Sequence, residues 1–536
     1  MRLAVTENFA FGNKLLKVLT SRNFIIFLIL GIGAFLRLYN ISGKALWYDE
    51  ACSLSFTGYG WQDILTHRYM TRPVYFIILK LWVGLFGSGE FVARLPSVIF
   101  GIASILIIYK IAKLLFNQNV GMLSAFFFSI SPFQIYYSRE LRNYSLFLLL
   151  ALLSMFVFIK ILDRGRAILY SLYVMINILL VYTHPFGVYI ILAQTTYLLV
   201  LFKKVKLDSR WIMAQIILIL FSLLFLFWLS GRFGHVVNNE LDYITVPNFR
   251  SLLETAEVFS YGGYIQGHGG VGFRVSDSRL LIPRILTVFL CCLLIFGLLG
   301  NKKNDRPKLD SLSHLDKRLF LFLWLFIPIG ATYLYSRLVT PIYLNRYLLA
   351  ASAAFYIIVA RGIMLLPRMR YRISAMALAT VLTVYSLGLL YNPGSSEDWR
   401  KVAHYVKANI NQGDSIILVP IMQIVPFWYY FEYGKAENLS GIDKCGRQVE
   451  GEWRTEFIEN GHLVLGFSVG NDQDMIAGKI DNLKNIKHDI WLIISPYWVK
   501  ADFYNLITGL LRKHFFLKHA KYFSYDGVEV AVYSIK

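Results

Sequence analysis

The sequence predicts a polytopic α-helical membrane protein that ends in a small α/β domain. Its 536 residues are 56% hydrophobic and 16% aromatic but only 16% charged, and the mean hydropathy is +0.52. A soluble globule could not bury that much apolar surface. The net charge of +21 comes from short basic clusters between apolar runs. This is the positive-inside pattern of membrane proteins and not a patch that binds nucleic acid.

Apolar runs of about 20 residues, the length of a membrane-spanning helix, recur along the chain. Eleven such runs lie at 23–40, 95–116, 120–137, 142–160, 168–184, 186–202, 211–230, 281–299, 318–336, 345–365 and 373–391. Basic clusters fall at every second junction, on the same side as Lys14, Lys17 and Arg22. The positive-inside rule therefore predicts a cytoplasmic N-terminus and an extracytoplasmic C-terminal part.

One further apolar stretch, 73–86, would break this alternation if it crossed the membrane. It is short, opens with Arg72-Pro73 and carries Lys80 and Trp82, which is typical of a helix lying in the outer interface. The alternative is thirteen crossings, with one more span that the pattern does not reveal. The predicted count is thus about 11 to 13.

The predicted domains are a transmembrane domain, 1–391, and an extracytoplasmic domain, 392–536. The first has an outer loop at 41–94, which holds the interfacial helix, and a large outer loop at 231–280. In the second, periodicity predicts helices and strands, and Asp526-Gly527 predicts a hairpin. The helices are expected at 398–408 and 504–511, and the strands at 415–419, 462–469 and 489–494. About 145 residues can bury a core of their own.

The adjacent acids Asp49 and Glu50 follow the first apolar run. Carboxylates so close to a bilayer are costly unless a site uses them. The alternative is a solvated turn or the N-cap of the next helix, a position that Asp favours. The pair is therefore the first candidate for chemistry at the membrane surface.

Arginines gather at the same predicted level of the outer face, which positive-inside statistics disfavour unless they meet an anion. Arg139 and Arg142 share a tight corner with Glu140 and Tyr144, and the alternative for this corner is an ordinary polar turn with a local Arg–Glu pair. The other arginines at this level are Arg72, Arg94 and Arg346. Together they predict a site for a phosphate or pyrophosphate headgroup.

Two features could suggest a cofactor, and neither is diagnostic. If a divalent metal binds, Glu50, His184 and His268 are candidate ligands, but their spacing fits no known pattern, and a lone histidine at a helix end is more often a hydrogen-bond partner. The glycine-rich stretch 262–270 has no Walker pattern and follows no strand. It suits a mobile lid over a lipid-facing cavity better than a nucleotide site.

These motifs resemble the GT-C class of membrane glycosyltransferases, in the bacterial branch related to protein O-mannosyltransferases and lipid A aminoarabinose transferases. Each motif is short, but they recur in the same order over residues 23–391. They are Trp47-Tyr48-Asp49-Glu50, Arg72-Pro73, Arg94-Leu95-Pro96-Ser97, Tyr136-Tyr137-Ser138-Arg139-Glu140 with Arg142 and Tyr144, Thr183-His184-Pro185-Phe186-Gly187 and Asn345-Arg346-Tyr347-Leu348-Leu349.

The resemblance implies a GT-C-like fold and an inverting transfer of a sugar from a polyprenyl-phosphate-linked donor. The acceptor would be a hydroxyl of a glycan, lipid or protein at the outer face of the cytoplasmic membrane. Asp49 would be the catalytic base, with Glu50 orienting it or the acceptor, and Arg72 would hold the lipid phosphate. Further candidates for binding the phosphate or sugar are Arg94, Arg139, Glu140, Arg142, Tyr144, His184 and Arg346.

The main alternative is a flippase or transporter for a lipid-linked glycan. Such proteins place charges inside their spans, whereas the charges here collect at one face.

Overall fold

The computed structural model describes residues 22–62, 71–202, 209–240, 244–264, 273–274, 279–300, 316–391, 398–432, 448–449, 452–453, 456–459, 461–468, 471–485, 488–495, 499, 501–523 and 528–535. The chain divides into two compact units. The membrane unit comprises Met1–Tyr39, His67–Tyr75 and Leu95–Asn392, and the outer unit comprises Asn40–Thr66, Phe76–Arg94 and Pro393–Lys536. Most of the first predicted outer loop therefore belongs with the C-terminal part and not with the helices that flank it.

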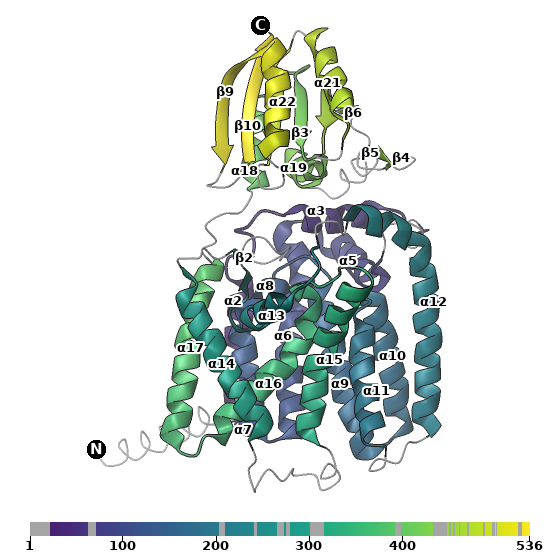
Figure 1. Ribbon diagram of the computed structural model, residues 1–536, viewed down its shortest axis with the longest axis vertical. Coiled ribbons are helices and arrows are strands. Elements are labelled where there is room, and N and C mark those ends of the chain that lie inside the picture. The colour runs from purple at the N-terminus through teal and green to yellow at the C-terminus, as the bar shows by residue number, and fades with distance from the viewer. Residues whose placement is uncertain are drawn as a thin grey trace, which may run out of the picture. The chain divides into compact units, whose positions relative to one another are not determined.

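The membrane unit is a bundle of helices (Figure 1). They are α2 (Arg22–Leu38), α6 (Glu90–Leu115), α7 (Gln118–Ile130), α8 (Pro132–Ser138), α9 (Tyr144–Arg164), α10 (Ala167–Thr183), α11 (Gly187–Val200), α12 (Ser209–Glu240), α13 (Phe249–Tyr261), α14 (Leu281–Leu299), α15 (Lys317–Leu338), α16 (Leu349–Leu365) and α17 (Met369–Tyr391). A 3₁₀ turn, η4 (Asn345–Leu348), leads into α16. The mainly helical membrane fold is thus confirmed.

All eleven predicted runs are helical, but the run at 120–137 is split. Ser131 takes an extended conformation, and its hydroxyl accepts the amide of Gln134, so α7 ends and α8 begins with Pro132 at its first position. Within the described residues, seven helices are long and apolar enough to cross a membrane, while α5 (Pro73–Phe86), α7, α10 and α11 are shorter. The count of 11 to 13 spans therefore stays a prediction.

Helix α16 lies at the centre of the membrane unit, and nearly all of its side chains are buried. It approaches α14 at two glycines. A Cβ atom on Gly362 would overlap the carbonyl oxygen of Leu293, and one on Gly297 would overlap that of Ile358. Small residues at a helix crossing allow the backbones to pack closely in a membrane. The crossing helps to fix α16, whose N-terminal end carries Arg346 through η4.

The predicted outer loop 231–280 is partly helical. Helix α12 continues to Glu240, and α13 starts after Asn248, which forms a capping box with Ser251. Part of the segment predicted as an outer loop is therefore helical, since α12 runs ten residues beyond the apolar run that ends at 230. Gly262 closes α13 with a φ of 82°, a left-handed conformation that favours glycine. The rest of the glycine-rich stretch, except Gly263 and Tyr264, lies outside the described residues, as does the lid predicted from it.

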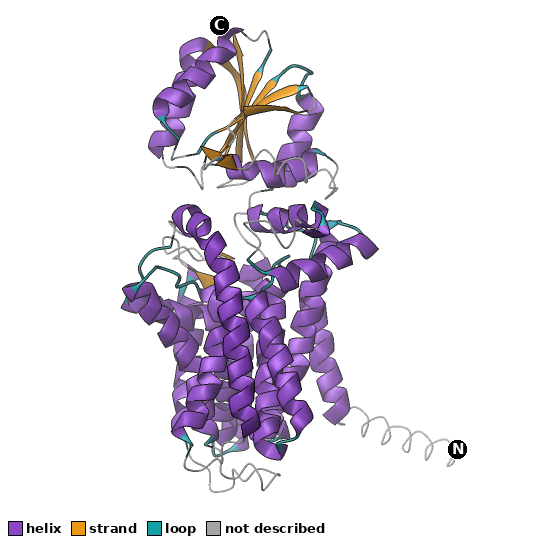
Figure 2. Ribbon diagram, turned by 90° about the vertical axis from the view of Figure 1, so that its right-hand side faces the viewer, coloured by secondary structure: helices purple, strands orange, loops and turns teal. Residues whose placement is uncertain are grey.

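The outer unit contains the predicted α/β fold. Its six-stranded sheet has the order β6-β7-β3-β8-β10-β9, in which β3 runs parallel to β7 and β8 and the other pairs are antiparallel. The strands are β3 (Ser415–Val419), β6 (Glu456–Glu459), β7 (His462–Gly466), β8 (Ile490–Ile494), β9 (Phe515–Phe523) and β10 (Val528–Ile535), and the helices are α18 (Trp399–Asn409), α19 (Ile424–Phe431), α21 (Gln473–Asn482) and α22 (Ala501–His514). Helices lie on both sides of the sheet (Figure 2). The predicted hairpin is the pairing of β9 with β10.

The residue pattern explains this core. The central strands β3 and β8 are buried on both faces, which is why they are continuous apolar runs. Helices α21 and α22 are amphipathic and cover one face, with Ile480, Ile507 and Leu511 in the same apolar cluster as Leu492.

Candidate active site

The acid pair lies at the start of a short helix in the outer unit, α3 (Tyr48–Ser55). Trp47 is the N-cap residue, and its carbonyl oxygen accepts the amides of Glu50 and Ala51, each at 3.0 Å. Asp49 and Glu50 therefore lie in the first turn, where the helix dipole favours negative charge. Asp49 is half-buried and Glu50 is buried. Because Trp47 and not Asp49 is the N-cap, capping does not explain the aspartate.

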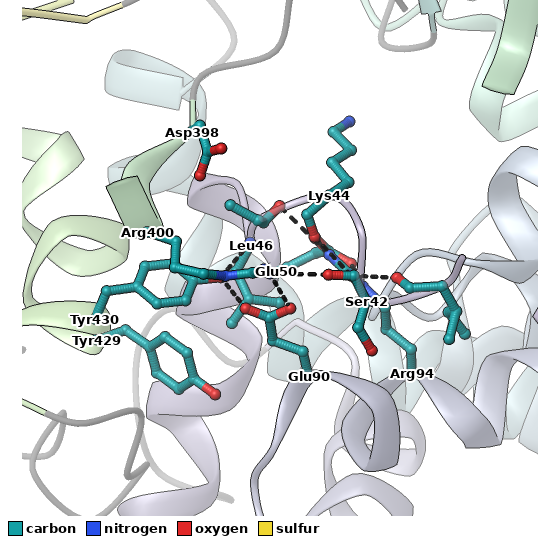
Figure 3. Close-up of polar contacts among 12 residues, drawn as sticks. Ser42, Lys44, Leu46, Glu50, Glu90, Arg94, Asp398, Arg400, Tyr429 and Tyr430 are labelled. Atoms are coloured by element: carbon teal, nitrogen blue, oxygen red, sulfur yellow. Dashed lines mark hydrogen bonds and ion pairs between the residues drawn. The ribbon is translucent and has the colours of Figure 1, made fainter. Parts of the chain in front are cut away.

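Glu50 forms a buried ion pair with Arg94 (Figure 3). The Nε of Arg94 donates to Oε1 of Glu50 at 2.8 Å, and Nη2 donates to Oε2 at 2.6 Å. The other guanidinium donors reach the carbonyl oxygens of Ile41 at 2.7 Å, Lys44 at 2.9 Å and Ala45 at 3.4 Å. All five N–H groups of Arg94 thus hold the backbone before α3 or the Glu50 carboxylate.

This network corrects two of the predicted roles. Arg94 was expected to bind a lipid phosphate, but its donors are used within the outer unit, and it is only 2% exposed. Glu50 was expected to orient Asp49 or the acceptor directly, but both of its oxygens bind Arg94. The pair fixes the entry to α3 and buries Glu50, whereas Asp49 is only half-buried.

A second predicted arginine is also occupied with local contacts. Arg139 ends α8, donates through Nη2 to the carbonyl oxygen of Tyr39 at 3.0 Å and lies over the ring of Tyr391 at 4.9 Å. The structure therefore ties Arg139 to the ends of α2 and α17.

The membrane unit brings three of the predicted arginines together around His184. Electrostatic interactions link the His184 ring with Arg72, Arg346 and Arg142. Arg72 precedes α5, Arg142 lies between α8 and α9, His184 follows α10, and Arg346 lies in η4. The corner that holds Arg142 is fixed by Asn143, whose side-chain amide donates to the carbonyl oxygen of Thr183 at 2.9 Å.

Aromatic rings complete this cluster, hereafter the arginine cluster. The guanidinium of Arg346 lies 5.9 Å from the ring centre of Tyr144 and 5.3 Å from that of Tyr347. The Tyr347 ring is 4.9 Å from His184 and 4.7 Å from Phe186. Sequence reasoning gave no role to Tyr347 or Phe186, although both lie in the motifs that carry Arg346 and His184. Aromatic faces next to an arginine attract its cation and shape the site.

The protonation state of His184 follows from its neighbours. Burial first, and then the positive charges of Arg72, Arg346 and Arg142, lower the pKa of His184 well below its ordinary value. The ring is therefore neutral at physiological pH. Its Nδ1 accepts the backbone amide of Phe186 at 3.2 Å, so the single ring proton lies on Nε2.

The arginine cluster thus presents donors. Among the described residues, the buried Nε2 of His184 and the hydroxyl of Tyr144 have no hydrogen-bond partner. Arg142, Arg346 and Glu140 are also buried, at 9%, 7% and 5% exposure. Guanidinium groups together with N–H and O–H donors match the oxygens of a phosphate.

The same environment does not suit the predicted metal candidates. A cation at His184 would lie beside three guanidinium groups, and Nδ1 already accepts an amide. Glu50 is neutralised by Arg94. His268 lies outside the described residues. Across the described part of the chain, no group of three histidine, cysteine or acidic side chains is placed to hold a metal.

Comparison with known proteins supports the predicted class. Residues 71–228 match the family model described as dolichyl-phosphate-mannose-protein mannosyltransferase. This segment includes Arg72, Arg142 and His184 but ends before Arg346. No curated protein sequence matches the chain.

Solved structures are similar over nearly the whole chain. ArnT from Cupriavidus metallidurans in the apo state gives a TM-score of 0.54 at 12% identity, covering 95% of this chain and 97% of that one. The same protein bound to undecaprenyl phosphate gives 0.54 at 11% identity with the same coverage. A third structure is the archaeal oligosaccharyltransferase AglB from Archaeoglobus fulgidus in complex with an inhibitory peptide and a dolichol-phosphate. Its TM-score is 0.53 at 10% identity, and the match covers 96% of this chain and 74% of AglB. At these identities the likeness concerns the fold.

The chain therefore has the fold of a GT-C membrane glycosyltransferase, as its motifs predicted. Residues 71–228 are similar to the protein mannosyltransferase model, and the fold of the whole chain is similar to that of ArnT.

Proposed function

We propose that the protein is an inverting glycosyltransferase that moves a hexose or pentose from a polyprenyl-phosphate-linked donor to a hydroxyl acceptor. The observation that carries this proposal is the arginine cluster, in which Arg72, Arg142 and Arg346 act electrostatically on His184 and Arg346 lies over the rings of Tyr144 and Tyr347. A buried site made of donors favours an anion over a neutral ligand. A phosphate next to an apolar helical bundle is most simply the headgroup of a membrane lipid.

In the proposed reaction the lipid phosphate is the leaving group. The bond between the anomeric carbon and the phosphate oxygen breaks, and the acceptor oxygen bonds to the same carbon from the opposite face. The donor leaves as a polyprenyl phosphate monoester, whose growing negative charge Arg72, Arg142 and Arg346 stabilise. Nε2 of His184 and the hydroxyl of Tyr144 add two neutral donors, which bind phosphate oxygens without a proton transfer.

The acceptor hydroxyl needs a base, because an alcohol is a weak nucleophile until its proton is removed. We assign this role to Asp49, which takes the proton as the new glycosidic bond forms. Three features support the assignment. Asp49 is not the N-cap of α3, it is half-buried and not sealed in the interior, and its neighbour Glu50 is already neutralised by Arg94.

The location follows from the charge pattern of the sequence. We place the reaction at the outer face of the cytoplasmic membrane, with the N-terminus in the cytoplasm. ArnT has been captured with undecaprenyl phosphate, and AglB with a dolichol-phosphate and a peptide. By analogy, the partners of this chain are a polyprenyl-phosphate-linked sugar and an acceptor that is a glycan, lipid or protein.

Lipid-phosphate binding is tested first, with undecaprenyl phosphate as the probe. Replacing Arg346 by Gln removes a buried charge that meets the phosphate, and a charge-assisted hydrogen bond contributes about 1.5–3 kcal/mol. Arg346→Gln should therefore weaken binding of undecaprenyl phosphate to the protein in nanodiscs by roughly 10–100-fold. The matched control is Arg250→Gln, since Arg250 is an exposed arginine of α13 that pairs with Glu254. Equal affinity of Arg346→Gln and the wild type would reject the phosphate site.

Transfer is tested in proteoliposomes with a panel of undecaprenyl-phosphate-linked hexoses and pentoses, together with envelope material from the host as acceptor. A transferase releases free undecaprenyl phosphate and gives a product whose anomeric configuration, read by NMR, is opposite to that of the donor. A flippase would move the intact donor across the bilayer and release none. Intact translocation without release would overturn the proposal.

A further inference from the structure

Two sets of hydrogen bonds within the outer unit hold the backbone that leads into α3 (Figure 3). Arg94, near the start of α6, binds three carbonyl oxygens of this segment, which spans 41–47 and is hereafter the entry loop. The remaining contacts come from the C-terminal α/β domain, more than 300 residues further along the chain.

Tyr430, on α19, makes the most informative of these contacts. Its hydroxyl oxygen accepts the backbone amide of Leu46 at 2.7 Å, and its proton is donated to Oε1 of Glu90 in a short hydrogen bond. Leu46 is fully buried. A buried amide without an acceptor is costly, so Tyr430 satisfies a group that the entry loop cannot satisfy itself. Burial, together with the charge of Glu90, raises the pKa of Tyr430 and keeps the phenol protonated.

Arg400, in the first turn of α18, makes a parallel contact. Its Nη2 donates to the carbonyl oxygen of Ser42 at 2.9 Å and to Oε2 of Glu90 at 2.5 Å. The side chain of Asp398 caps α18 by accepting the amide of Lys401, which fixes the turn that carries Arg400. Glu90 therefore accepts from Tyr430 with one oxygen and from Arg400 with the other.

The contacts converge on the residues just before the acid pair. Leu46 lies three positions before Asp49, and α19 also packs directly against α3. Glu90 is the first residue of α6, which carries Arg94 one turn later. The C-terminal domain and the start of α6 thus hold the entry loop as one hydrogen-bonded assembly.

We propose that the C-terminal domain positions the catalytic loop, with Tyr430 and Arg400 as positioning residues that act through the entry loop on Asp49. The inference rests on the proposed function, since Asp49 matters only if it is the base. Neither residue touches the reacting atoms. They set the direction in which α3 presents its first turn, and small displacements of a catalytic group reduce turnover strongly.

The test compares two neighbouring tyrosines in the full-length protein in nanodiscs. Tyr430→Phe removes the acceptor for Leu46 and the donor to Glu90. Tyr429→Phe is the matched control, because the Tyr429 hydroxyl donates to the carbonyl oxygen of Ser88, a residue outside the entry loop, at 3.1 Å. Hydrogen–deuterium exchange of peptides covering 40–55 reports the loop, and peptides of β3 and β8 report the integrity of the fold.

Tyr430→Phe should speed exchange of the Leu46 amide roughly tenfold, and Tyr429→Phe should leave it unchanged. With an undecaprenyl-phosphate-linked sugar that the wild type uses, Tyr430→Phe should lower kcat roughly 10–100-fold. The donor KM and the affinity for undecaprenyl phosphate should stay within about twofold, because the arginine cluster is untouched. Arg400→Gln, which loses the contact with Ser42, should act in the same direction.

Three results would overturn the proposal: unchanged exchange in Tyr430→Phe, an equal change in Tyr429→Phe, or a loss confined to KM. A wild-type protein without any transfer activity would instead reject the proposed function. The exchange measurement needs no activity, so it would still decide whether the α/β domain holds the entry loop.

Discussion

Glu50→Gln separates a structural from a catalytic role for the second acid of the pair. Glu50 is 1% exposed and Arg94 is 2% exposed, and two short hydrogen bonds join them. The glutamine keeps one acceptor oxygen but loses the charge, and it turns an amide donor toward the guanidinium. Leaving one partner of a buried ion pair uncompensated costs about 3–5 kcal/mol. We expect Glu50→Gln to destabilise the outer unit by about that amount.

The assay compares Glu50→Gln with Asp49→Asn in apparent Tm and in turnover. A change of 1 kcal/mol shifts Tm by about 2–4 °C for a unit of this size, so Glu50→Gln should melt clearly earlier than the wild type. Asp49→Asn keeps the size and shape of a half-buried side chain, so it should shift Tm much less than Glu50→Gln does. It should, however, lower turnover roughly 10²–10⁴-fold as the loss of a base.

The double variant Glu50→Gln/Arg94→Gln completes a thermodynamic cycle. Because removal of both charges leaves no buried ion alone, it should be less destabilised than the sum of the single variants. The reasoning is refuted if Glu50→Gln keeps the wild-type Tm and loses as much turnover as Asp49→Asn. Glu50 would then have a catalytic role and not a structural role in holding the entry to α3.

Two further predictions concern the membrane unit. Burial and the neighbouring arginines keep the pKa of His184 depressed in the folded state. Above about pH 6.5 the ring is neutral in both the folded and the unfolded chain, so it does not affect stability. Below about pH 6.5 the unfolded chain binds a proton that the folded chain excludes, so stability falls as the pH falls. The drop in Tm between pH 7 and pH 5 should therefore be smaller in His184→Gln than in the wild type, and equal drops would contradict the burial of a neutral ring. Gly362→Ala should reduce the folded fraction seen by size-exclusion chromatography, because the new Cβ would overlap the carbonyl oxygen of Leu293 on α14. The control Gly330→Ala on α15 has open space around the new Cβ and should be tolerated. Similar elution profiles for the two variants would show that α14 and α16 can separate without cost.

Local sequence patterns were enough to predict most of the helices and the central strands of the fold. Apolar length predicted the helices, and an apolar run followed by turn residues predicted β3 and β8 at nearly their observed bounds. Both signals depend on neighbours in sequence, which is why they can be read without the tertiary structure. The end of α12 was missed because the helix continues to Glu240, beyond the apolar run from which it was predicted.

The candidate site could be predicted only in part. Charge at the expected membrane level singled out Arg72, Arg142 and Arg346, and the family resemblance added His184. Electrostatic interactions link all three arginines with His184 in the structure. The same signal selected Arg94, whose donors bind backbone carbonyl oxygens and Glu50, and Arg139, which donates to the carbonyl oxygen of Tyr39. Residue type and predicted membrane level do not say which group an arginine binds, because its partner depends on the direction of the side chain in the folded protein.

The sequence by itself determined the class of protein, the helical membrane unit, the α/β tail and the pair of acids at the start of a loop. Only the tertiary structure decided how the two acid side chains are buried and that Glu50 pairs with Arg94. Glu50 is neutralised by Arg94 in the interior of the outer unit, while Asp49 remains half-exposed one position earlier. Tyr430 and Arg400 lie hundreds of residues away and have no motif, yet they hold the backbone before the pair. Such contacts are set by long-range packing, which local sequence patterns do not encode.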